Sequence, residues 1–353
     1  MMSYQKLKEI GRGGFGIVYS VTDADGQELA LKELNFAAAG EGEQVPLRRR
    51  FEREVRYQHG IEHPNVVAIY DFNLDDDPPW FVMPLADGSL ADELRKDQRL
   101  GGDPKKPLFD ILAGLEALHK RGFCHRDLKP ANVLRFESDA GKIVYKISDF
   151  GLTTPGAGMT STLTASNMAG GTVMYRPPEC AINFRRATAQ ADIYSFGAIL
   201  HDIFGTTTRT PHGELTVPGD LGPIVEKCTK TQARRRYRTA EALREELYEV
   251  ISRGDIKFES QEEEELINLL LDNDALTDEQ WDKLFDQIDI NAERGTPNRN
   301  IFQVISRNHI RSLFESAPDM AMGLGELFCE FTDYHHFDFE YCDIISDKAQ
   351  VFF

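Results

Sequence analysis

This chain of 353 residues lacks long apolar runs and closely spaced cysteines. No apolar stretch approaches the roughly 20 residues that a membrane-spanning helix needs. The first residues, MMSYQKLKEIGRGG, lack the apolar middle of a signal peptide. The five cysteines are widely spaced and form no C-x-x-C motif, which argues against a disulfide framework. We therefore expect a cytoplasmic protein that makes no contact with a membrane.

Basic residues are scarce in the last third of the chain. From Arg253 onward there are 8 lysines and arginines against 23 aspartates and glutamates, whereas residues 1–252 carry 32 and 35. Such an acidic segment argues against nucleic acid as a partner. The change in composition predicts a domain boundary near residue 253. The hydrophobic share of 41% is typical of globular proteins, so we expect both parts to fold.

The stretch GRGGFG at residues 11–16 contains a G-x-G-x-x-G pattern, which has two known structural uses. In a dinucleotide-binding turn, a helix must follow the last glycine directly. Here β-branched residues follow, then the turn signal Asp25-Gly26 and a second strand-like run from Glu28 to Leu34. The pattern therefore predicts a β-hairpin whose glycine loop closes over nucleotide phosphates.

Phosphoryl transfer also needs a cation on the nucleotide phosphates. Lys32 lies between the apolar residues Leu31 and Leu34 on the expected strand, downstream of the glycine loop. It requires a carboxylate partner to hold it in place. A basic helix around RRRFEREVRYQHG offers Glu54, with Glu52 as the alternative, and the spacing to HPNVV favours Glu54.

HRDLKPANVL at 125–134 and ISDFGL at 147–152 supply the remaining groups that this chemistry requires. Asp127 would orient the acceptor hydroxyl and accept its proton, and Lys129 would neutralise charge on the transferred phosphoryl group. Asn132 and Asp149 offer an amide and a carboxylate oxygen, and both are hard ligands of the kind that Mg²⁺ prefers. The two stretches together predict a phosphotransferase site.

These motifs, together with LALK and RPPE in the same order, resemble those of eukaryotic-type (Hanks-type) protein serine/threonine kinases over residues 4 to about 252. The resemblance implies an α+β bilobal fold with a small antiparallel β lobe and one helix (about 1–83), a hinge (84–87) and a large helical lobe (88–252). It implies ATP in the cleft with Mg²⁺, for which Mn²⁺ is a possible substitute, and protein substrates bearing Ser or Thr. The short chain is similar to bacterial stand-alone members of the family.

Further residues take their expected roles from the family motifs alone. Glu179 would pair with Arg236, and Asp192 would cap the backbone of the catalytic loop. Met83 stands at the gatekeeper position. The residues expected around ATP are Gly11, Gly13, Gly14, Phe15, Gly16, Val18, Ala30, Lys32, Met83, Leu85 and Leu134.

Two positions depart from the family pattern. Four residues after Glu54, where an apolar residue of the column that links the lobes is usual, this chain has Gln58. Either the register of that helix is shifted by one turn, or the column is weakened and needs outside support. Pro84 replaces the usual acidic residue of the hinge, which we expect to be neutral for catalysis.

Three other functions compete with a serine/threonine kinase. A small-molecule kinase is not expected to carry Lys129 in DLKPAN or the GTVMYRPPE segment, and a tyrosine kinase typically replaces LKP. A pseudokinase that acts as a scaffold should have lost Lys32, Asp127, Asn132 or Asp149, and none is lost. Thr172 fits the hydroxyl that contacts Asp127 in serine/threonine kinases.

Activation-loop phosphorylation is expected from Arg126, which directly precedes Asp127. A phosphate in the loop would gain charge-assisted bonds to Arg126 and to the arginines of RRRFER. Those arginines are Arg48, Arg49 and Arg50, and the hydroxyls expected to be modified are Thr160, Ser161, Thr162 and Thr164.

The acidic region 253–353 is expected to be an all-α appendage that could dock a partner. Trp281, Leu284, Phe285 and Ile288 recur at helical spacing, and the stretches from Ser260 and Thr277 are capping boxes. Cysteine and histidine are the residue types that bind Zn²⁺, but adjacent histidines rarely face one metal, so we expect surface positions. The residues in question are Cys329, His335, His336 and Cys342.

Overall fold

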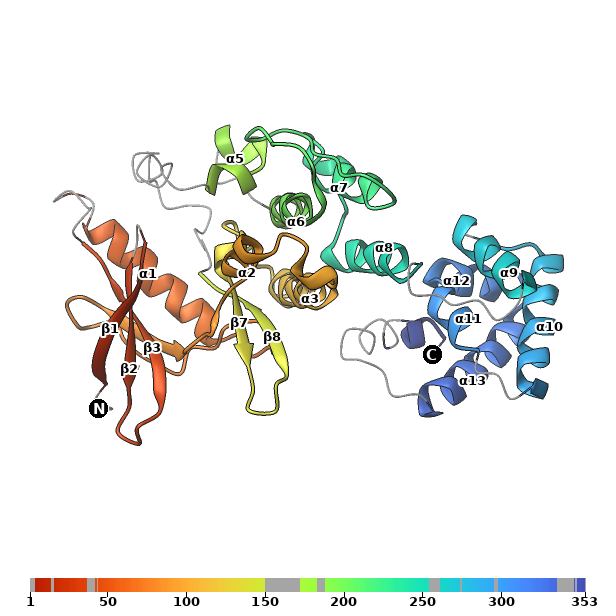
Figure 1. Cartoon of the computed structure of the whole chain (residues 1–353), viewed down its shortest axis with the longest axis horizontal. Coiled ribbons are helices and arrows are strands. Elements are labelled where there is room, and N and C mark those ends of the chain that lie inside the picture. Colours follow the sequence, from red (N-terminus) through yellow and green to blue (C-terminus); the bar gives the residue numbers. More distant parts are fainter. Residues whose placement is uncertain are drawn as a thin grey trace. The chain divides into compact units, whose positions relative to one another are not determined.

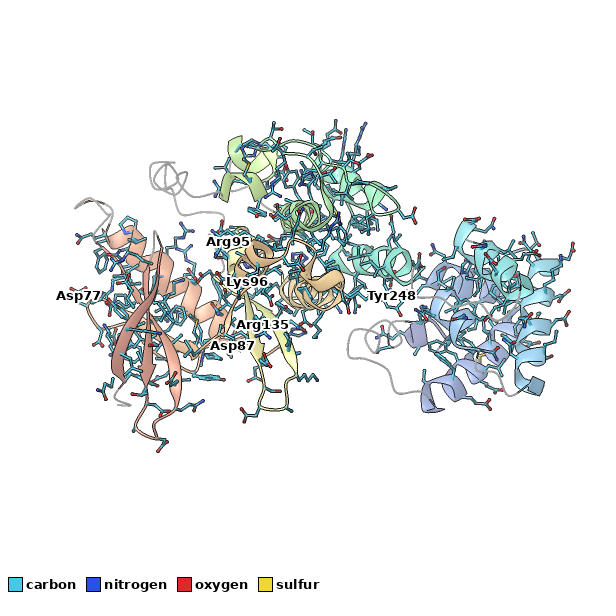
Figure 2. All side chains as sticks on the ribbon, in the orientation of Figure 1. Asp77, Asp87, Arg95, Lys96, Arg135 and Tyr248 are labelled. Atoms are coloured by element: carbon cyan, nitrogen blue, oxygen red, sulfur yellow. The ribbon has the colours of Figure 1, made fainter. Side chains whose placement is uncertain are left out.

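The computed structural model describes residues 4–13, 16–36, 42, 44–149, 172–182, 188–253, 261–273, 275–294, 298–334, 346 and 348–352. The chain divides into two compact units, Met1–Leu247 and Tyr248–Phe353, which are treated separately below. Tyr248, the first residue of the second unit, is labelled in Figure 2. Within the described residues, no helix combines the length and the apolar character needed to span a bilayer.

A five-stranded antiparallel sheet opens the first unit, in the order β1-β2-β3-β5-β4. Its strands are β1 (Gln5–Arg12), β2 (Gly16–Thr22), β3 (Glu28–Leu34), β4 (Asp71–Asn73) and β5 (Trp80–Pro84). β2 and β3 form the expected hairpin, and Gly26 in its turn has a φ of 82°, a value that glycine adopts without strain. The hairpin predicted from the glycine loop is confirmed.

The alternation of β3 directs Lys32 toward helix α1 (Gln44–His59). Leu29 and Leu31 pack in one apolar cluster, while Ala30 and Leu34 pack in another with residues of α1. Because successive strand residues face opposite sides of a sheet, Lys32 shares the face of Ala30 and Leu34. Figure 1 shows α1 beside β1–β3 in the red and orange part of the ribbon.

The rest of the first unit is mainly helical. Its described helices are α2 (Leu90–Lys96), α3 (Lys105–Lys120), α5 (Pro178–Ile182), α6 (Ala189–Phe204) and α7 (Gly222–Cys228), and α8 (Ala240–Arg253) begins in this unit and continues past Leu247 into the second. A three-stranded sheet joins β6 (Gly88–Ser89), β7 (Val133–Glu137) and β8 (Ile143–Ile147). The described residues of this unit also form the 3₁₀ turns η1 (Leu100–Gly102), η2 (Pro130–Asn132), η4 (Thr172–Tyr175) and η6 (Ala233–Arg235).

Buried polar contacts fasten these elements to each other. Asp110 of α3 is 2% exposed and accepts a bond from the backbone amide of Tyr145 on β8 at 2.7 Å. At the end of the segment expected to form the hinge, Asp87 donates its amide to the carbonyl of Arg135 at 2.9 Å, and Figure 2 labels both residues. A Cβ on Gly197 of α6 would lie 2.5 Å from the Cβ of Cys228, so glycine allows α6 to approach α7 closely.

The regular elements that the structure describes in the second unit are all helices, and they share a core of their own. Its helices are α9 (Gln261–Asp272), α10 (Asp278–Arg294), α11 (Arg299–Val304), α12 (Arg307–Ser316) and α13 (Pro318–Tyr334). Trp281 is 1% exposed in this core, and Phe352 packs its ring against Phe328. Thr277 and Gln280 form the predicted capping box with bonds of 2.8 and 3.4 Å. Ser260 lies outside the described residues.

The predicted α+β bilobal fold with a helical C-terminal region is confirmed. The antiparallel sheet and α1 form the small lobe, and the helices from α2 to α7, with the first residues of α8, form the large one.

Gly16 is required by packing, which gives a direct test of the hairpin. A Cβ at this position would lie 2.9 Å from the carbonyl oxygen of Glu33 and 3.3 Å from Cε of Lys32. We expect Gly16→Ala to lower the free energy of unfolding by about 1–3 kcal/mol. Chemical denaturation measures it.

Gly13→Ala is the matched control, because a Cβ there meets nothing within 4 Å. Its effect should stay within about 0.5 kcal/mol. Equal losses in both variants would contradict the assigned packing of Gly16.

Candidate active site

Lys32 is the centre of the site. It is 8% exposed, and its Nζ lies 3.6 Å from Oε1 of Glu54 and in direct contact with Oδ1 of Asp149. Glu54 comes from α1, and Asp149 comes from the segment that follows β8. The structure thus places Glu54, the partner expected for Lys32, beside it, together with Asp149, which was selected separately as a metal ligand. The rival carboxylate, Glu52, bonds instead to Arg48 at 3.1 Å.

The charges of this cluster depend on each other. Burial alone would lower the pKa of Lys32, but the carboxylates of Asp149 and Glu54 outweigh it and raise that pKa. Burial raises the pKa of Glu54, which Lys32 only partly opposes. For Asp149 burial acts in the same direction, yet Lys32 holds its pKa below the ordinary value. Lys32 and Asp149 are therefore a charged pair at neutral pH.

The loop from His125 to Asn132 holds Asp127 between two donors. Lys129 Nζ donates to Oδ2 of Asp127 at 2.9 Å, and Nδ2 of Asn132 donates to the same oxygen at 3.2 Å. Asn132 Nδ2 also donates to the carbonyl of Asp127 at 2.8 Å. These contacts fix the carboxylate in one orientation within the site.

Asn132 and Asp149 are joined through the backbone. Ser148 donates its amide to the carbonyl of Asn132 at 2.8 Å, and its Oγ donates to the same oxygen at 3.1 Å. Nδ2 of Asn132 donates to Asp127, so the Oδ1 atom of Asn132 is the other polar atom of that side chain. Together with the Asp149 carboxylate it forms a pair of hard donors, a set that suits Mg²⁺.

Asp192 of α6 anchors the loop from below. Its fully buried carboxylate accepts the amides of His125 and Arg126 at 2.8 and 2.7 Å, and Nε2 of His119 lies 2.9 Å away. Burial by itself raises the pKa of Asp192, but the contact with His119 and the amides lowers it overall. Arg126 has a φ of 67°, which is unusual for a residue with a side chain. The buried carboxylate holds this conformation.

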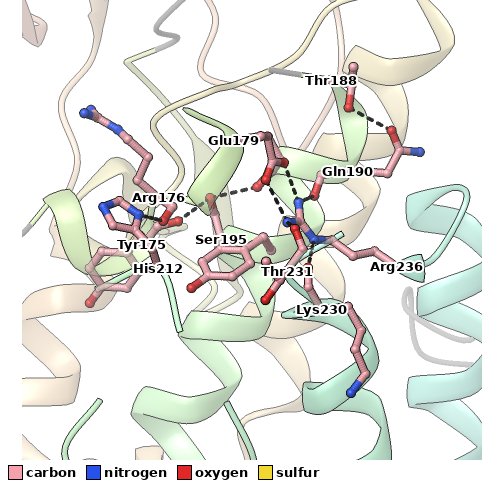
Figure 3. A network of polar contacts seen from close by, with 12 residues as sticks. Tyr175, Arg176, Glu179, Thr188, Gln190, Ser195, His212, Lys230, Thr231 and Arg236 are labelled. Carbon is pink, nitrogen blue, oxygen red and sulfur yellow. Dashed lines mark hydrogen bonds and ion pairs between the residues drawn. The ribbon is translucent and has the colours of Figure 1, made fainter. Parts of the chain in front are cut away.

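Glu179 and Arg236 form the predicted pair, shown in Figure 3. Arg236 Nη1 and Nη2 donate to the two carboxylate oxygens at 2.6 and 2.9 Å. Arg236 also donates to the carbonyls of Lys230 and Gln190 at 2.7 and 2.9 Å. A bidentate pair of this kind fixes α5 against the 230–236 segment.

The apolar side chains expected around ATP lie in one cluster that also includes residues of α1. Ala30 and Met83 are buried in it, and three others are partly buried against it: Val18, Leu85 and Leu134. Gly11 and Gly13 belong to the β1–β2 hairpin, where the amide of Gly13 donates to the carbonyl of Gly16 at 2.9 Å. Gly14 and Phe15 lie outside the described residues.

Arg48, one of the arginines expected to bind a phosphate of the activation loop, has other partners in this structure. Its Nη2 donates to the carbonyls of Leu74 and Asp76, both at 2.6 Å, on the side of α1 that faces the loop before β5. Two residues further along α1, roughly 200° around the helix, Arg50 lies within electrostatic reach of Asp127 and Arg176. Arg48 and Arg50 thus lie on different faces of α1, although they are nearly adjacent in the sequence.

Several predicted positions cannot be placed. The hydroxyls of Thr160, Ser161, Thr162 and Thr164 lie outside the described residues, as do His335, His336 and Cys342. Thr172 begins η4, and Cys329 is exposed on α13. Among the side chains that the structure describes, no cluster of three or more His, Cys, Asp or Glu is arranged to hold a metal ion.

Sequence reasoning missed the contacts that hold the segment around η4. Tyr175 donates its hydroxyl to Oδ2 of Asp202 at 2.6 Å, and Arg209 stacks over the Tyr175 ring at 4.3 Å. His212, with a φ of 62°, contacts the carbonyl of Arg176 through Nδ1 at 2.7 Å. These partners are far apart in the sequence, and the short motifs contain no signal for them.

Comparison with known proteins agrees with this geometry. The protein kinase domain family matches residues 4–286. PrkC, a serine/threonine-protein kinase of Bacillus subtilis (strain 168), is 31% identical over 293 residues, which cover 74% of this chain and 43% of PrkC. AfsK, a serine/threonine-protein kinase of Streptomyces griseus, is 31% identical over 252 residues, 65% of this chain and 29% of AfsK.

A third relative comes from an animal. The probable serine/threonine-protein kinase zyg-1 of Caenorhabditis briggsae is 28% identical over 249 residues, 68% of this chain and 33% of that protein. The chain spans less than half the length of each of these three relatives. The resemblance inferred from the motifs is confirmed, and the chain belongs to the protein kinase domain family.

Proposed function

We propose that this chain is a protein serine/threonine kinase that transfers the γ-phosphoryl group of ATP to Ser or Thr hydroxyls of proteins. The observation that carries the proposal is the single constellation of Lys32 with Glu54 and Asp149, beside Asp127 with Lys129. The relatives named above are serine/threonine-protein kinases, which supports the same reaction.

The donor set fits a divalent cation beside the nucleotide. Asn132 and Asp149 would hold Mg²⁺, or Mn²⁺ in its place, through an amide oxygen and a carboxylate. When bound, the ion would neutralise charge on the phosphates. The described contacts leave these two oxygen donors on adjoining segments that Ser148 ties together.

The protein's own residues supply positioning and charge. Asp127 accepts the proton of the attacking hydroxyl as its oxygen bonds to the γ-phosphorus and the bond to the ADP oxygen breaks. Lys129, 2.9 Å from Asp127, stabilises negative charge on the transferred group. Lys32 binds the nucleotide phosphates, with Glu54 and Asp149 holding its ammonium in position.

The Glu179–Arg236 pair favours a protein substrate over a small molecule. It fastens the RPPE segment to the large lobe, in a position to support a platform for an extended peptide. A pseudokinase should have lost at least one of four residues, and all four are present in one site: Lys32, Asp127, Asn132 and Asp149. The proposal therefore names an active enzyme.

A cytoplasmic location is part of the proposal. Cys124, Cys180, Cys228 and Cys329 are free thiols, as expected in a reducing compartment.

Removal of the catalytic groups tests the proposed reaction. With labelled ATP and a generic Ser/Thr peptide, Asp127→Asn should lower the rate by at least about 10³-fold. Lys32→Ala should cost about 10²–10³-fold, as expected for one preorganised charge. Lys8→Ala, an exposed lysine of the same sheet, is the control and should match the wild type.

Wild-type protein that binds ATP but labels no peptide or protein would support the scaffold alternative instead. In that case Asp127→Asn would leave the biological output intact.

We further propose control by phosphorylation of the 153–172 segment at one or more of Thr160, Ser161, Thr162 and Thr164. Arg53 and Arg176 both lie within electrostatic reach of Arg50 of α1, as do the carboxylates of Glu54 and Asp127. Burial and the two neighbouring arginines lower the pKa of Arg50, whereas the two carboxylates raise it. A doubly charged phosphate beside these arginines would gain charge-assisted bonds.

Arg176→Gln tests this control. Preincubation with ATP should raise the activity of the wild type. In the variant this increase should be about tenfold smaller, which corresponds to the loss of one charge-assisted hydrogen bond. Arg48→Gln is the matched control, since its guanidinium is bonded elsewhere, and should keep the gain. Mass spectrometry that finds an active protein with no phosphate between residues 153 and 172 would contradict the proposal.

The second unit is proposed as a docking surface for a protein partner. Its own apolar core and the excess of acidic residues from 253 onward support a role in recognition. The residues proposed above for the chemistry all belong to the first unit.

Loss of the core ring of Phe352 tests this role. Phe352 is 5% exposed against Phe314 and Phe328, so Phe352→Ala should destabilise the unit by about 3–5 kcal/mol. We expect unchanged phosphorylation of a short peptide and reduced phosphorylation of the native proteins labelled in lysate. Met322→Ala, at a position 50% exposed, is the control. Equal rates for Phe352→Ala and wild type on both substrates would remove the docking role.

A further inference from the structure

Gln58 is a buried amide one helical turn after Glu54 on α1. It is 1% exposed, and its Nε2 donates to the carbonyl oxygen of Val67 at 2.8 Å. The pairing of Glu54 with Lys32 fixes the register of α1, so Gln58 truly occupies the position flagged as a departure in the sequence. A polar side chain there requires a physical explanation.

The partner of Gln58 is itself bound to β8. The amide of Val67 donates to the carbonyl of Ile147 at 3.0 Å, and the amide of Ile147 donates to the carbonyl of Asn65 at 2.9 Å. Nδ2 of Asn65 adds a bond to the carbonyl of Tyr145 at 3.1 Å. The 65–67 segment is thus fastened along the last residues of β8, and Asp149 follows Ile147 by two residues.

These bonds close a ring through the candidate active site. From Gln58 it passes through the 65–67 segment to Ile147 and along the chain to Asp149. Lys32 then connects Asp149 to Glu54, and one turn of α1 returns to Gln58. Both carboxylates that hold Lys32 are therefore tied to each other by a second route.

We propose that Gln58 is a positioning residue that fixes the Glu54 turn of α1 against the strand carrying Asp149. Its catalytic consequence rests on the proposed kinase function, whereas the mechanical coupling does not. Hydrogen bonds are directional, so the amide specifies both the rotation and the height of α1 along its axis. Apolar packing alone specifies these less sharply.

Even a small outward movement of α1 would break its contact with Lys32. The Lys32–Glu54 distance of 3.6 Å is already long for an ion pair, so an outward shift of about 1 Å would break it. Val67 is fully buried, and loss of its donor would leave a carbonyl oxygen without that bond. Both effects favour release of α1 when the amide is removed.

The test combines kinetics with amide hydrogen exchange on the full chain. Gln58→Leu keeps the approximate volume and removes the amide, and should lower kcat/KM for a Ser/Thr peptide about fivefold. In a Glu54→Gln background the same change should have little further effect, because the contact that it positions is already altered. Exchange of the α1 amides, residues 44–59, should accelerate in Gln58→Leu.

Thr229→Val is the matched control. Thr229 is also fully buried and donates to the carbonyl of Val225 at 2.8 Å, but it belongs to the large-lobe segment after α7. Its effect should be the same with and without Glu54→Gln, and it should leave the exchange of α1 unchanged. If Gln58→Leu does not fold, Gln58→Met replaces it in the same measurements.

The outcomes separate this proposal from the kinase assignment. Unchanged exchange of α1 in the Gln58 variant, or an equal loss of kcat/KM with and without Glu54, would overturn the positioning role. If the wild type has no kinase activity but amide exchange of α1 is still faster in Gln58→Leu than in the wild type, the proposed function is refuted and the coupling stands.

Discussion

The position of one ammonium group, that of Lys32, depends on most of the first unit. Its two carboxylates come from elements far apart in the sequence, Glu54 on α1 and Asp149 after β8. The side chains of Lys32 and Glu54 are largely buried, and such a charged pair is costly to desolvate and is stable only when its geometry is held by its surroundings. The alternation of β3, the apolar face of α1 and the attachment of β8 to α3 therefore all serve the same contact.

A second buried charge performs the corresponding task in the large lobe. Asp192 is fully buried on α6, yet its ordinary hydrogen-bonding needs are met by backbone amides and by His119. The amides belong to the loop that contains Asp127. In the same loop Arg126 has an uncommon backbone conformation. A reactive group on a loop, here Asp127, is thus held in a fixed position by hydrogen bonds from the loop backbone to a side chain of a buried helix.

The sequence predicted those parts of the site that are specified by local patterns, and not those that depend on contacts between residues far apart in the sequence. The hairpin, the Lys32–Glu54 pair and the Asp127 loop were predictable because their signals are strand alternation, helix spacing and short motifs. The partner of Gln58 was not, since it is a backbone carbonyl, and every residue carries one. Arg48 and Arg50 are nearly adjacent in the sequence but lie on different faces of α1. Gly16 was selected for its approach to phosphates, whereas its close neighbours in the structure are Glu33 and Lys32.

The end of the first unit shows the same difference between pattern and packing. The family match continues to residue 286, into α10, although the chain divides between Leu247 and Tyr248. Trp281 and Leu284 of α10 are buried in a core with residues of α9, α11 and α13. Residue patterns can be shared by helices that pack in different places, whereas a core is defined by the side chains that exclude water together. By that criterion α10 belongs to the second unit.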